Sequence, residues 1–171
     1  TGCGPIGMLC LLAARRAGAV EIVMTDIAES ALANARDCGA DRVINTKDEP
    51  ELLAAYGDDK GYFDVMFECT GAAPALIGGL TAVRPRAVIV QLGMGGDMSL
   101  PMVMVTAKEL DLRGSFRFHE EFAIGIALMG QGLIDVKPLI SHTVPLADAE
   151  QAFMIATDPL QPSLKTQIQF F

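Results

Sequence analysis

Short apolar runs alternate along most of the chain with segments whose apolar residues recur at helical spacing. The strand-like runs are residues 21–26, 42–45, 63–68, 87–92 and 110–116. The helical segments are residues 6–17, 27–38, 49–56, 73–83 and 120–131. Regular alternation of strand and helix is typical of an α/β fold built on a doubly wound parallel sheet. We therefore predict one such sheet, with helices on both faces.

The pattern changes after about Val136. Residues 139–144 and 166–170 have the pattern of strands and residues 147–156 that of a helix, but the simple alternation does not continue. We predict that residues 1–136 form one domain. Residues 137–171 are expected to form a C-terminal tail that belongs to a second structural unit.

Composition supports a buried sheet rather than a membrane span. The chain has 171 residues, of which 51% are hydrophobic, and its mean hydropathy is +0.36. No stretch approaches the roughly 18 uninterrupted apolar residues that span a bilayer. The strands of a parallel sheet are apolar on both faces, which accounts for the high apolar content. We expect no membrane partner.

Charge and cysteine usage exclude further classes. The net charge is −8 and the isoelectric point is near 4.6, which argues against a nucleic-acid partner. Four cysteines are present without C-x-x-C spacing, and we interpret them as reduced thiols rather than a disulfide or zinc framework. They are Cys3, Cys10, Cys38 and Cys69. For a protein of this class we expect a cytoplasmic location.

A methionine-rich stretch predicts a contact between copies of the chain. We expect a short edge strand from Met98 to Pro101, and sheet edges pair readily with a second copy. Methionine side chains adapt well to interaction surfaces, but they also fill ordinary cores. The four concerned are Met94, Met98, Met102 and Met104. We predict a homo-oligomer that pairs at this edge. The alternative, that these methionines belong to the core, stays open.

The first seven residues carry the clearest chemical signal. Gly2, Gly4 and Gly7 have the spacing G-x-G-x-x-G and open a helical segment. In a Rossmann-type fold the first glycine permits a tight turn, the second lets a pyrophosphate approach and the third lets the helix pack close to the sheet. The N–H groups that begin the helix then face the anion. The motif predicts a dinucleotide site.

An acidic residue downstream supports this prediction. Asp26 ends a strand-like run nineteen residues after Gly7, where a carboxylate binds the hydroxyls of an adenosine ribose. The same carboxylate would repel the 2′-phosphate of NADP, and no arginine occurs in the next nine residues. The sequence therefore favours NAD over NADP as cofactor.

The motif normally follows a strand, but here it opens the sequence. We expect the first, central strand of the sheet to be absent, so that the strands ending at Asp26 and Glu68 have no common neighbour. A proteolytic or truncated chain would explain this, and so would a swapped strand that fills the gap.

Several sequence motifs, in their order along the chain, resemble those of the C-terminal half of the zinc-dependent medium-chain alcohol and polyol dehydrogenases. They are T-G-C-G-P-I-G, T-D at 25–26, F-D-V-M-F-E-C-T-G-A, V-I-V-Q-L-G-M-G, K-E-L-D-L-R-G-S-F-R-F and L-I-D-V-K-P-L-I-S-H-T-V-P-L-A-D-A-E-Q-A-F. The likeness covers nearly the whole chain, and it is strongest with the sugar-acid branch. It implies hydride transfer between NAD and an alcohol group of a polyol or an L-idonate-like sugar acid.

The resemblance also implies roles for single residues. The pyrophosphate would lie on Gly2, Gly4, Pro5, Ile6 and Gly7, and the adenosine ribose on Asp26. Cys69 and Thr70 would line the cleft, and Lys165 would pair with the pyrophosphate. The nicotinamide would meet Val90, Gln91, Leu92, Ser115, Phe116 and Arg117. Many family members carry a basic residue at the position of Ala31 and glycine at that of Gln91, so this chain departs from the pattern twice.

In this family a zinc ion held by an N-terminal catalytic domain activates the alcohol. The resemblance therefore implies that this chain holds neither catalytic residues nor metal ligands and that it is inactive alone. The tail at 137–171 would pack on the missing domain. His119 and His142 are more often structural than proton relays, and Glu68 either supports the cleft or is solvated.

Two other functions stay open. One is a zinc-free medium-chain reductase of the quinone-reducing kind, which would lack the Cys, His and Glu zinc ligands upstream. The other is a non-enzymatic dinucleotide-binding module, which needs no catalytic domain. The tail after Val136 argues against the second alternative.

Overall fold

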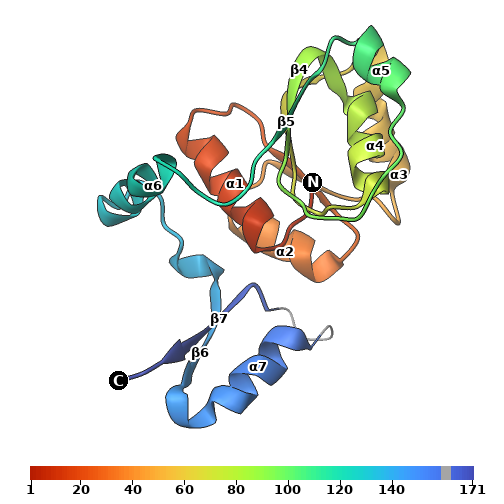
Figure 1. Ribbon diagram of the computed structural model, residues 1–171. Helices are drawn as coiled ribbons and strands as arrows, with labels where there is room; N and C mark the ends of the chain where they lie inside the picture. The colour runs from red at the N-terminus through yellow and green to blue at the C-terminus, as the bar shows by residue number, and fades with distance from the viewer. Residues whose placement is uncertain (159–162) are drawn as a thin grey trace.

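Figure 1 shows the computed structural model, which describes residues 1–158 and 163–171. Its α-helices are α1 (Pro5–Arg16), α2 (Glu29–Asp37), α3 (Pro50–Ala54), α4 (Ala73–Ala82), α5 (Met102–Ala107), α6 (Glu121–Gly130) and α7 (Ala149–Thr157). Its strands are β1 (Val23–Asp26), β2 (Arg42–Asn45), β3 (Phe63–Glu68), β4 (Val83–Gln91), β5 (Asp111–Gly114), β6 (Ile140–Pro145) and β7 (Lys165–Gln169). Short 3₁₀ helices are η1 (Ala55–Lys60), η2 (Lys137–Leu139) and η3 (Leu146–Asp148).

All strand pairs in the described residues are parallel, as the alternation of strand and helix predicts. β1 pairs with β2, and β4 lies between β3 and β5. In register, Glu68 of β3 faces Gln91 of β4, which in turn faces Gly114 of β5. The carboxyl ends of these three strands therefore meet at one level, where the side chains and loops that follow them can act together.

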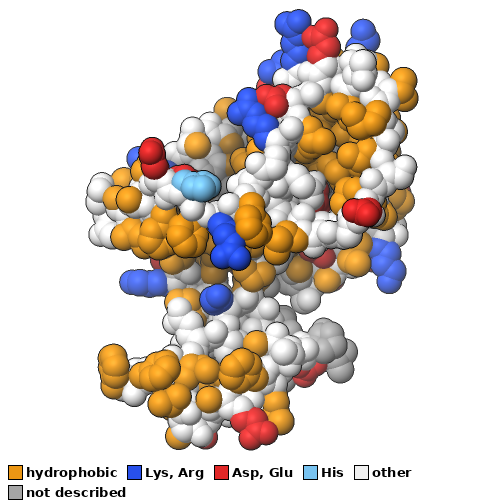
Figure 2. Space-filling view, in the orientation of Figure 1, with side chains coloured by type: hydrophobic (Ala, Val, Ile, Leu, Met, Phe, Trp, Pro, Cys, Tyr) orange, Lys and Arg blue, Asp and Glu red, His pale blue; other side chains and the backbone are white. Residues whose placement is uncertain are grey.

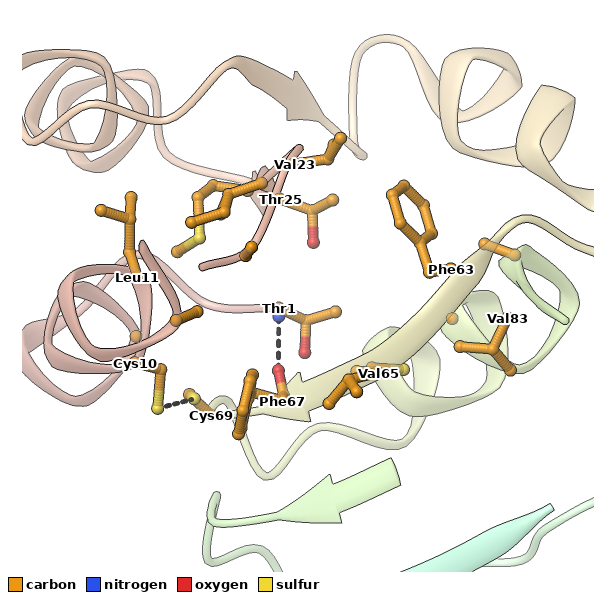
Figure 3. A pocket seen from close by; sticks show the side chains of 18 of the residues that line it. Thr1, Cys10, Leu11, Val23, Thr25, Phe63, Val65, Phe67, Cys69 and Val83 are labelled. Atoms are coloured by element: carbon orange, nitrogen blue, oxygen red, sulfur yellow. Dashed lines mark hydrogen bonds between the residues drawn. The ribbon is translucent and has the colours of Figure 1, made fainter. Parts of the chain in front are cut away.

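A pocket separates β1 from β3, and we call it the inter-strand pocket (Figure 3). It is lined from one side by residues of β1 such as Val23 and from the other by residues of β3 such as Val65. Thr1 lies between the two strands, where its terminal ammonium donates to the Phe67 carbonyl at 2.6 Å. Gly2 N donates to the Thr25 carbonyl at 2.8 Å. Within the described residues no strand joins β1 to β3, as expected.

Two apolar cores fix the helices on the strands. The first combines α1, β1 and α2 through Met8, Leu11, Met24 and Leu32, with Leu139 from η2. The second combines β3, α4 and β4, and its fully or nearly fully buried members are Met66, Leu76, Leu80, Val83, Ala87 and Ile89. Burying one such side chain stabilises a fold by about 1.5–3 kcal/mol, so these clusters hold α1 and α4 in place.

The predicted edge strand from Met98 to Pro101 is wrong. These residues form no strand, and Met98 and Leu100 instead pack against the second core. Pro101 is the N-cap of helix α5, which the sequence pattern did not predict. β5 forms one edge of the sheet β3-β4-β5, and its four residues are exposed. The four methionines fall into two groups. Met98 and Met104 pack against the core, whereas Met94 and Met102 are exposed.

The last part of the chain contains a separate two-stranded sheet. β6 and β7 pair in parallel with each other, and α7 packs on both. The helix predicted at 147–156 and the strand predicted at 166–170 correspond to α7 and β7 within three residues. Apolar side chains gather on this unit and over α6 (Figure 2), and the exposed ones in the unit are Leu146, Phe153, Met154, Phe170 and Phe171. No helix in the described part of the chain is long and apolar enough to cross a membrane.

Lys108 closes the end of α4. Its Nζ donates to the carbonyl oxygens of Leu80, Thr81 and Val83 at 2.9, 2.8 and 2.7 Å. The last carbonyls of a helix have no intrahelical donor, so an ammonium group placed there satisfies them. Burial lowers the pKa of Lys108, which agrees with a cation held against the protein surface. This contact joins the end of α5 to the end of α4.

We expect Lys108→Met to destabilise the fold by about 1–2 kcal/mol, because three carbonyls lose a charged donor. Urea unfolding of the variant measures the effect. Lys47→Met, at an exposed position after β2, is the matched control and should change the free energy of unfolding much less. Equal effects of the two substitutions would show that the Lys108 bonds contribute nothing.

Candidate functional site

A cleft opens at the carboxyl ends of β1 and β3, and we call it the strand-end cleft. It is bordered by the loop before α1, the end of β1, the loop after β3, and residues along α3 and α4. Its lining residues are Gly2, Gly4, Thr25, Asp26, Ile27, Thr46, Pro50, Leu53, Ala54, Cys69, Thr70, Ala72, Pro74, Ala75, Gly78 and Thr81. In open α/β sheets such a crevice is the usual ligand site. The structure thus places Gly2 and Gly4 of the glycine motif around one cleft with Asp26, Cys69 and Thr70.

Helix α1 begins at this cleft without a protein cap. Gly4 is its N-cap residue, Pro5 occupies the first turn, and no side chain bonds to the helix start. The first N–H groups of any α-helix lack intrahelical acceptors, so those of Ile6 and Gly7 remain for an external acceptor. Gly4, Pro5 and Ile6 are exposed. The helix start therefore offers N–H donors and a positive dipole end to an anion.

The three glycines are required for different reasons. Gly2 has φ +85°, and a Cβ on it would lie 2.8 Å from the Thr70 methyl group. A Cβ on Gly7 would overlap the carbonyl oxygen of Gly2. At Gly4 a Cβ would meet nothing within 4 Å, and its φ of −73° suits any residue. Gly2 and Gly7 thus serve the fold, while the open space at Gly4 is what a ligand would need.

Asp26 already holds the loop around the cleft. One carboxylate oxygen accepts the N–H of Cys3 at 2.7 Å, and the other accepts those of Ile27 and Ala28 at 2.7 and 3.0 Å. A carboxylate has about four acceptor positions, so these bonds leave capacity for a hydroxyl group. The side chain is only partly buried, at the mouth of the cleft. Asp26 both orients the glycine loop and presents charge to the cleft.

Glu68 is the fully buried charge beneath the cleft, with 0% of its surface exposed. Its carboxylate accepts the N–H of Thr70 at 2.8 Å, the N–H of Gly71 at 2.9 Å and the amide of Gln91 at 2.6 Å, and it also accepts the Thr70 hydroxyl. Burial by itself would raise the pKa of Glu68, but these hydrogen bonds outweigh it and the pKa is lowered. The solvated alternative is wrong, because Glu68 organises the loop after β3.

Residues predicted to meet a nicotinamide lie farther along the same edge, outside the lining of the strand-end cleft. Val90 and Gln91 end β4 with Leu92 next to them, and Ser115 N donates to the Gln91 carbonyl at 2.9 Å. Among the described residues, the Gln91 side-chain oxygen is buried and has no hydrogen-bond partner.

The segment after β5 is exposed and bends sharply. Arg117 has φ +62°, and its guanidinium lies 5.0 Å from the centre of the Phe116 ring. Such a cation–π contact can hold the arginine against the ring. The structure therefore places Ser115, Phe116 and Arg117 beside the end of β4 without closing them over the cleft.

Other predicted residues are not brought to the cleft. Lys165 begins β7 and is exposed, and it does not line the cleft. His119 is exposed just before α6, and His142 lies in β6.

All four cysteines are free thiols, and no group of three or more His, Cys, Asp or Glu in the described part of the chain could hold a metal ion. Sequence reasoning missed the closeness of Cys10 to Cys69, since no spacing rule places a helix residue beside a strand end.

Comparison with known proteins agrees with this arrangement. The family model described as zinc-binding dehydrogenase matches residues 5–131. The chain is 39% identical over 171 residues to L-idonate 5-dehydrogenase (NAD(P)(+)) of Escherichia coli K12, covering 99% of this chain and 49% of that protein. It is 35% identical over 156 residues to human sorbitol dehydrogenase, covering 89% of this chain and 44% of that protein. The chain thus spans about half the length of these relatives.

Solved structures give the same result. The crystal structure of L-idonate 5-dehydrogenase from Escherichia coli matches with a TM-score of 0.91 and 39% identity, over 99% of this chain and 48% of that one. An Escherichia coli alcohol dehydrogenase, rspB, crystallised with NADH, matches with a TM-score of 0.87 at 23% identity, over 99% of this chain and 50% of that one. The second likeness is evidence of fold alone.

We expect Glu68→Gln to destabilise the protein by about 2–4 kcal/mol near neutral pH, because a buried charged acceptor with several donors is lost. The pKa of Glu68 is lowered by folding, so its contribution is complete above the ordinary glutamate pKa of about 4.5 and is lost as pH falls below it. The difference between wild type and variant should therefore shrink on acidification. Urea unfolding from about pH 7 to about pH 3 measures it. Exposed Glu51→Gln is the control, and a difference that persists unchanged at the acid end would refute the explanation.

Two glycine-to-alanine variants of the motif test the packing argument. Gly7→Ala should destabilise the fold by about 3 kcal/mol or more, because its Cβ would overlap the Gly2 carbonyl. Gly4→Ala should change stability by less than about 1 kcal/mol, since its Cβ has open space. Thermal unfolding of both variants decides the matter. Similar melting temperatures for the two would contradict the packing argument.

Proposed function

Since the chain belongs to the zinc-binding dehydrogenase family, we propose that it is the NAD-binding part of an oxidoreductase and that the strand-end cleft is where NAD binds. The reaction we assign to the whole enzyme is hydride transfer between NAD and an alcohol group of a polyol or L-idonate-like sugar acid. The relatives named L-idonate 5-dehydrogenase and sorbitol dehydrogenase support this substrate class. The observation that carries the NAD assignment is the open space at Gly4 beside an uncapped helix start.

The pyrophosphate would lie at the start of α1. Gly4 leaves room for it, and the N–H groups of Ile6 and Gly7 point out of the first turn as donors. Gly2 lies against the Thr70 methyl group at the same cleft. Among the described residues no side-chain cap at the helix start competes with the anion. These features fit a dinucleotide better than they fit a structural turn.

The adenosine ribose would lie on Asp26, as in other folds with this motif. The carboxylate keeps acceptor capacity after its bonds to Cys3, Ile27 and Ala28. Its negative charge favours ribose hydroxyls and disfavours a 2′-phosphate. We therefore propose that the protein prefers NAD to NADP.

The nicotinamide end would extend along the edge formed by β4 and β5. When bound, the nicotinamide ring accepts or donates the hydride. The backbone of Val90, Gln91 and Leu92 is held at this edge because Glu68 accepts the Gln91 amide and the N–H of Leu92 donates to the Glu68 carbonyl. Ser115, Phe116 and Arg117 would cover the ring from the neighbouring strand end. Glu68 is thus a positioning residue beneath both loops.

Zinc chemistry is not supported by this chain's own residues, because the described part of the chain contains no cluster that fits a metal ion. We assign the zinc site to a catalytic domain of a longer protein and expect no alcohol oxidation by the 171-residue chain alone. The family description favours this over a zinc-free quinone-type reductase. The exposed apolar residues of the unit at 137–171, such as Phe153 and Phe170, support its role as a docking tail for that domain. A module that only binds dinucleotides would have no use for such a tail.

A homo-oligomer would use β5 rather than residues 98–101. β5 is an edge strand of its sheet with all four residues exposed, whereas Met98 packs against the second core. Unpaired strand edges are the usual sites of pairing between copies.

Titration of the purified protein with NADH tests the proposed function, with the change in nicotinamide fluorescence as readout. We expect saturable binding, and we expect Gly4→Val to weaken it strongly because the side chain would occupy the open space. Gly125→Ala, at an open position in α6, should bind as wild type does. Equal binding by the Gly4 variant would show that NADH lies elsewhere.

Asp26→Asn tests the cofactor preference. The substitution keeps the size of the side chain and removes the charge, so the ratio of NADPH to NADH affinity should rise by about tenfold, or ~1.4 kcal/mol. Exposed Asp37→Asn at the end of α2 is the matched control. Isothermal titration with both dinucleotides measures the ratio. A wild-type protein that prefers NADPH would overturn the assignment of Asp26.

A further inference from the structure

Two thiols from separate elements meet beside the cleft. Cys10 comes from the middle of α1 and Cys69 follows the last residue of β3 directly, and Figure 3 shows their side chains pointing toward each other. Their sulfur atoms are 3.8 Å apart, with the Cys69 thiol donating to Cys10. Both side chains are partly buried and line the inter-strand pocket. The other two cysteines differ, because Cys3 is fully buried and Cys38 follows α2.

The two sulfur atoms are near enough to form a disulfide after a small movement. A disulfide is about 2.0 Å long, so the two sulfurs need to approach by about 1.8 Å. Rotation about the two side chains can supply part of this, and the loop after β3 can supply the rest. In that loop the N–H of Cys69 donates to the Thr1 carbonyl at 3.0 Å. Contact between sulfurs on two different elements is what oxidation to a disulfide requires.

We propose that Cys10 and Cys69 are a redox modification site, which forms a reversible disulfide and thereby lowers the affinity of the strand-end cleft for dinucleotide. The oxidant is a small disulfide such as oxidised glutathione. The Cys10 thiolate attacks one of its sulfurs, forming a mixed disulfide and releasing the first thiol. The Cys69 thiolate then attacks the Cys10 sulfur and releases the second. Two electrons pass from the protein pair to glutathione, and the two thiol protons end on the two glutathione molecules released.

Local chemistry indicates which cysteine reacts first. The hydrogen bond from the Cys69 thiol lowers the pKa of Cys10, while the same contact together with burial raises the pKa of Cys69. A thiol with a lowered pKa is the better attacking group, and its partner resolves the mixed disulfide. Cys10 is therefore the attacking cysteine and Cys69 the resolving one.

The bond would act on the cleft through Thr70. Cys69 lines both the inter-strand pocket and the strand-end cleft, and Thr70 follows it immediately. The Thr70 methyl group lies 2.8 Å from the position that a Cβ on Gly2 would take, so the loop after β3 lies directly against the glycine motif. Drawing Cys69 toward α1 moves Thr70 along the wall on which the dinucleotide would lie. The effect on affinity rests on the proposed function, but formation of the bond does not.

The first experiment tests the bond itself. The reduced protein is incubated with oxidised glutathione, blocked with an alkylating agent and digested without reductant. We expect one linked peptide pair that contains Cys10 and Cys69, reversed by dithiothreitol and absent from Cys69→Ser. Stable glutathione adducts on Cys10, or a different pairing of the four cysteines, would overturn the proposal. This readout needs no dinucleotide, so it stands even if the proposed function fails.

The second experiment tests the consequence. NADH is titrated into the reduced and oxidised wild type, with Cys10→Ser and Cys38→Ser treated in parallel. Oxidation should weaken NADH binding by about fivefold or more in wild type and in Cys38→Ser, and not at all in Cys10→Ser. Unchanged affinity after complete oxidation would refute the regulatory role. No NADH binding by the reduced wild type would instead refute the proposed function, and with it the regulatory role.

Discussion

The structure depends on a contact that only glycine permits. The carbonyl oxygen of Gly2 occupies the space that any side chain at position 7 would need, and the Thr70 methyl group fills the space beside Gly2 itself. Because of these two close approaches, α1 begins directly against the carboxyl ends of β1 and β3. The start of the helix, with its unpaired N–H groups, is then held at the mouth of the cleft. A larger residue at either position would move the helix away from the strands and the donors away from any ligand.

Buried charge supports the same edge from below. Glu68 ends β3 and collects donors from Thr70, Gly71 and Gln91, so that the loops after β3 and β4 are tied to one carboxylate. A buried carboxylate is stable only with such partners, which makes the loops and the charge depend on each other. Asp26 plays the corresponding part at the end of β1, where it accepts the N–H of Cys3. Two carboxylates at two strand ends therefore orient the loops that form the cleft.

The elements and the cleft could be predicted where local sequence determines them. The strand Phe63–Glu68 was predicted with its observed bounds, and Asp26 was predicted to share a dinucleotide site with the glycine motif because of its spacing from Gly7. Residues 98–101 could not be predicted from their local pattern. We predicted an edge strand there, but Met98 and Leu100 are partly buried by tertiary packing against the core of α4 and β4, and Pro101 caps the start of a helix. The burial of Glu68 and the contact between Cys10 and Cys69 depend on how distant segments meet, which local pattern does not encode.

In the proposed site, bare peptide groups at the start of α1 bind the pyrophosphate of NAD while Asp26 binds its ribose. A crystal structure of the protein with NADH tests this most directly. We expect density for the two phosphates beside Gly4 and the first turn of α1, with the adenosine ribose hydroxyls within hydrogen-bond distance of the Asp26 carboxylate. A dinucleotide bound away from α1, or with its adenosine ribose away from Asp26, would contradict it.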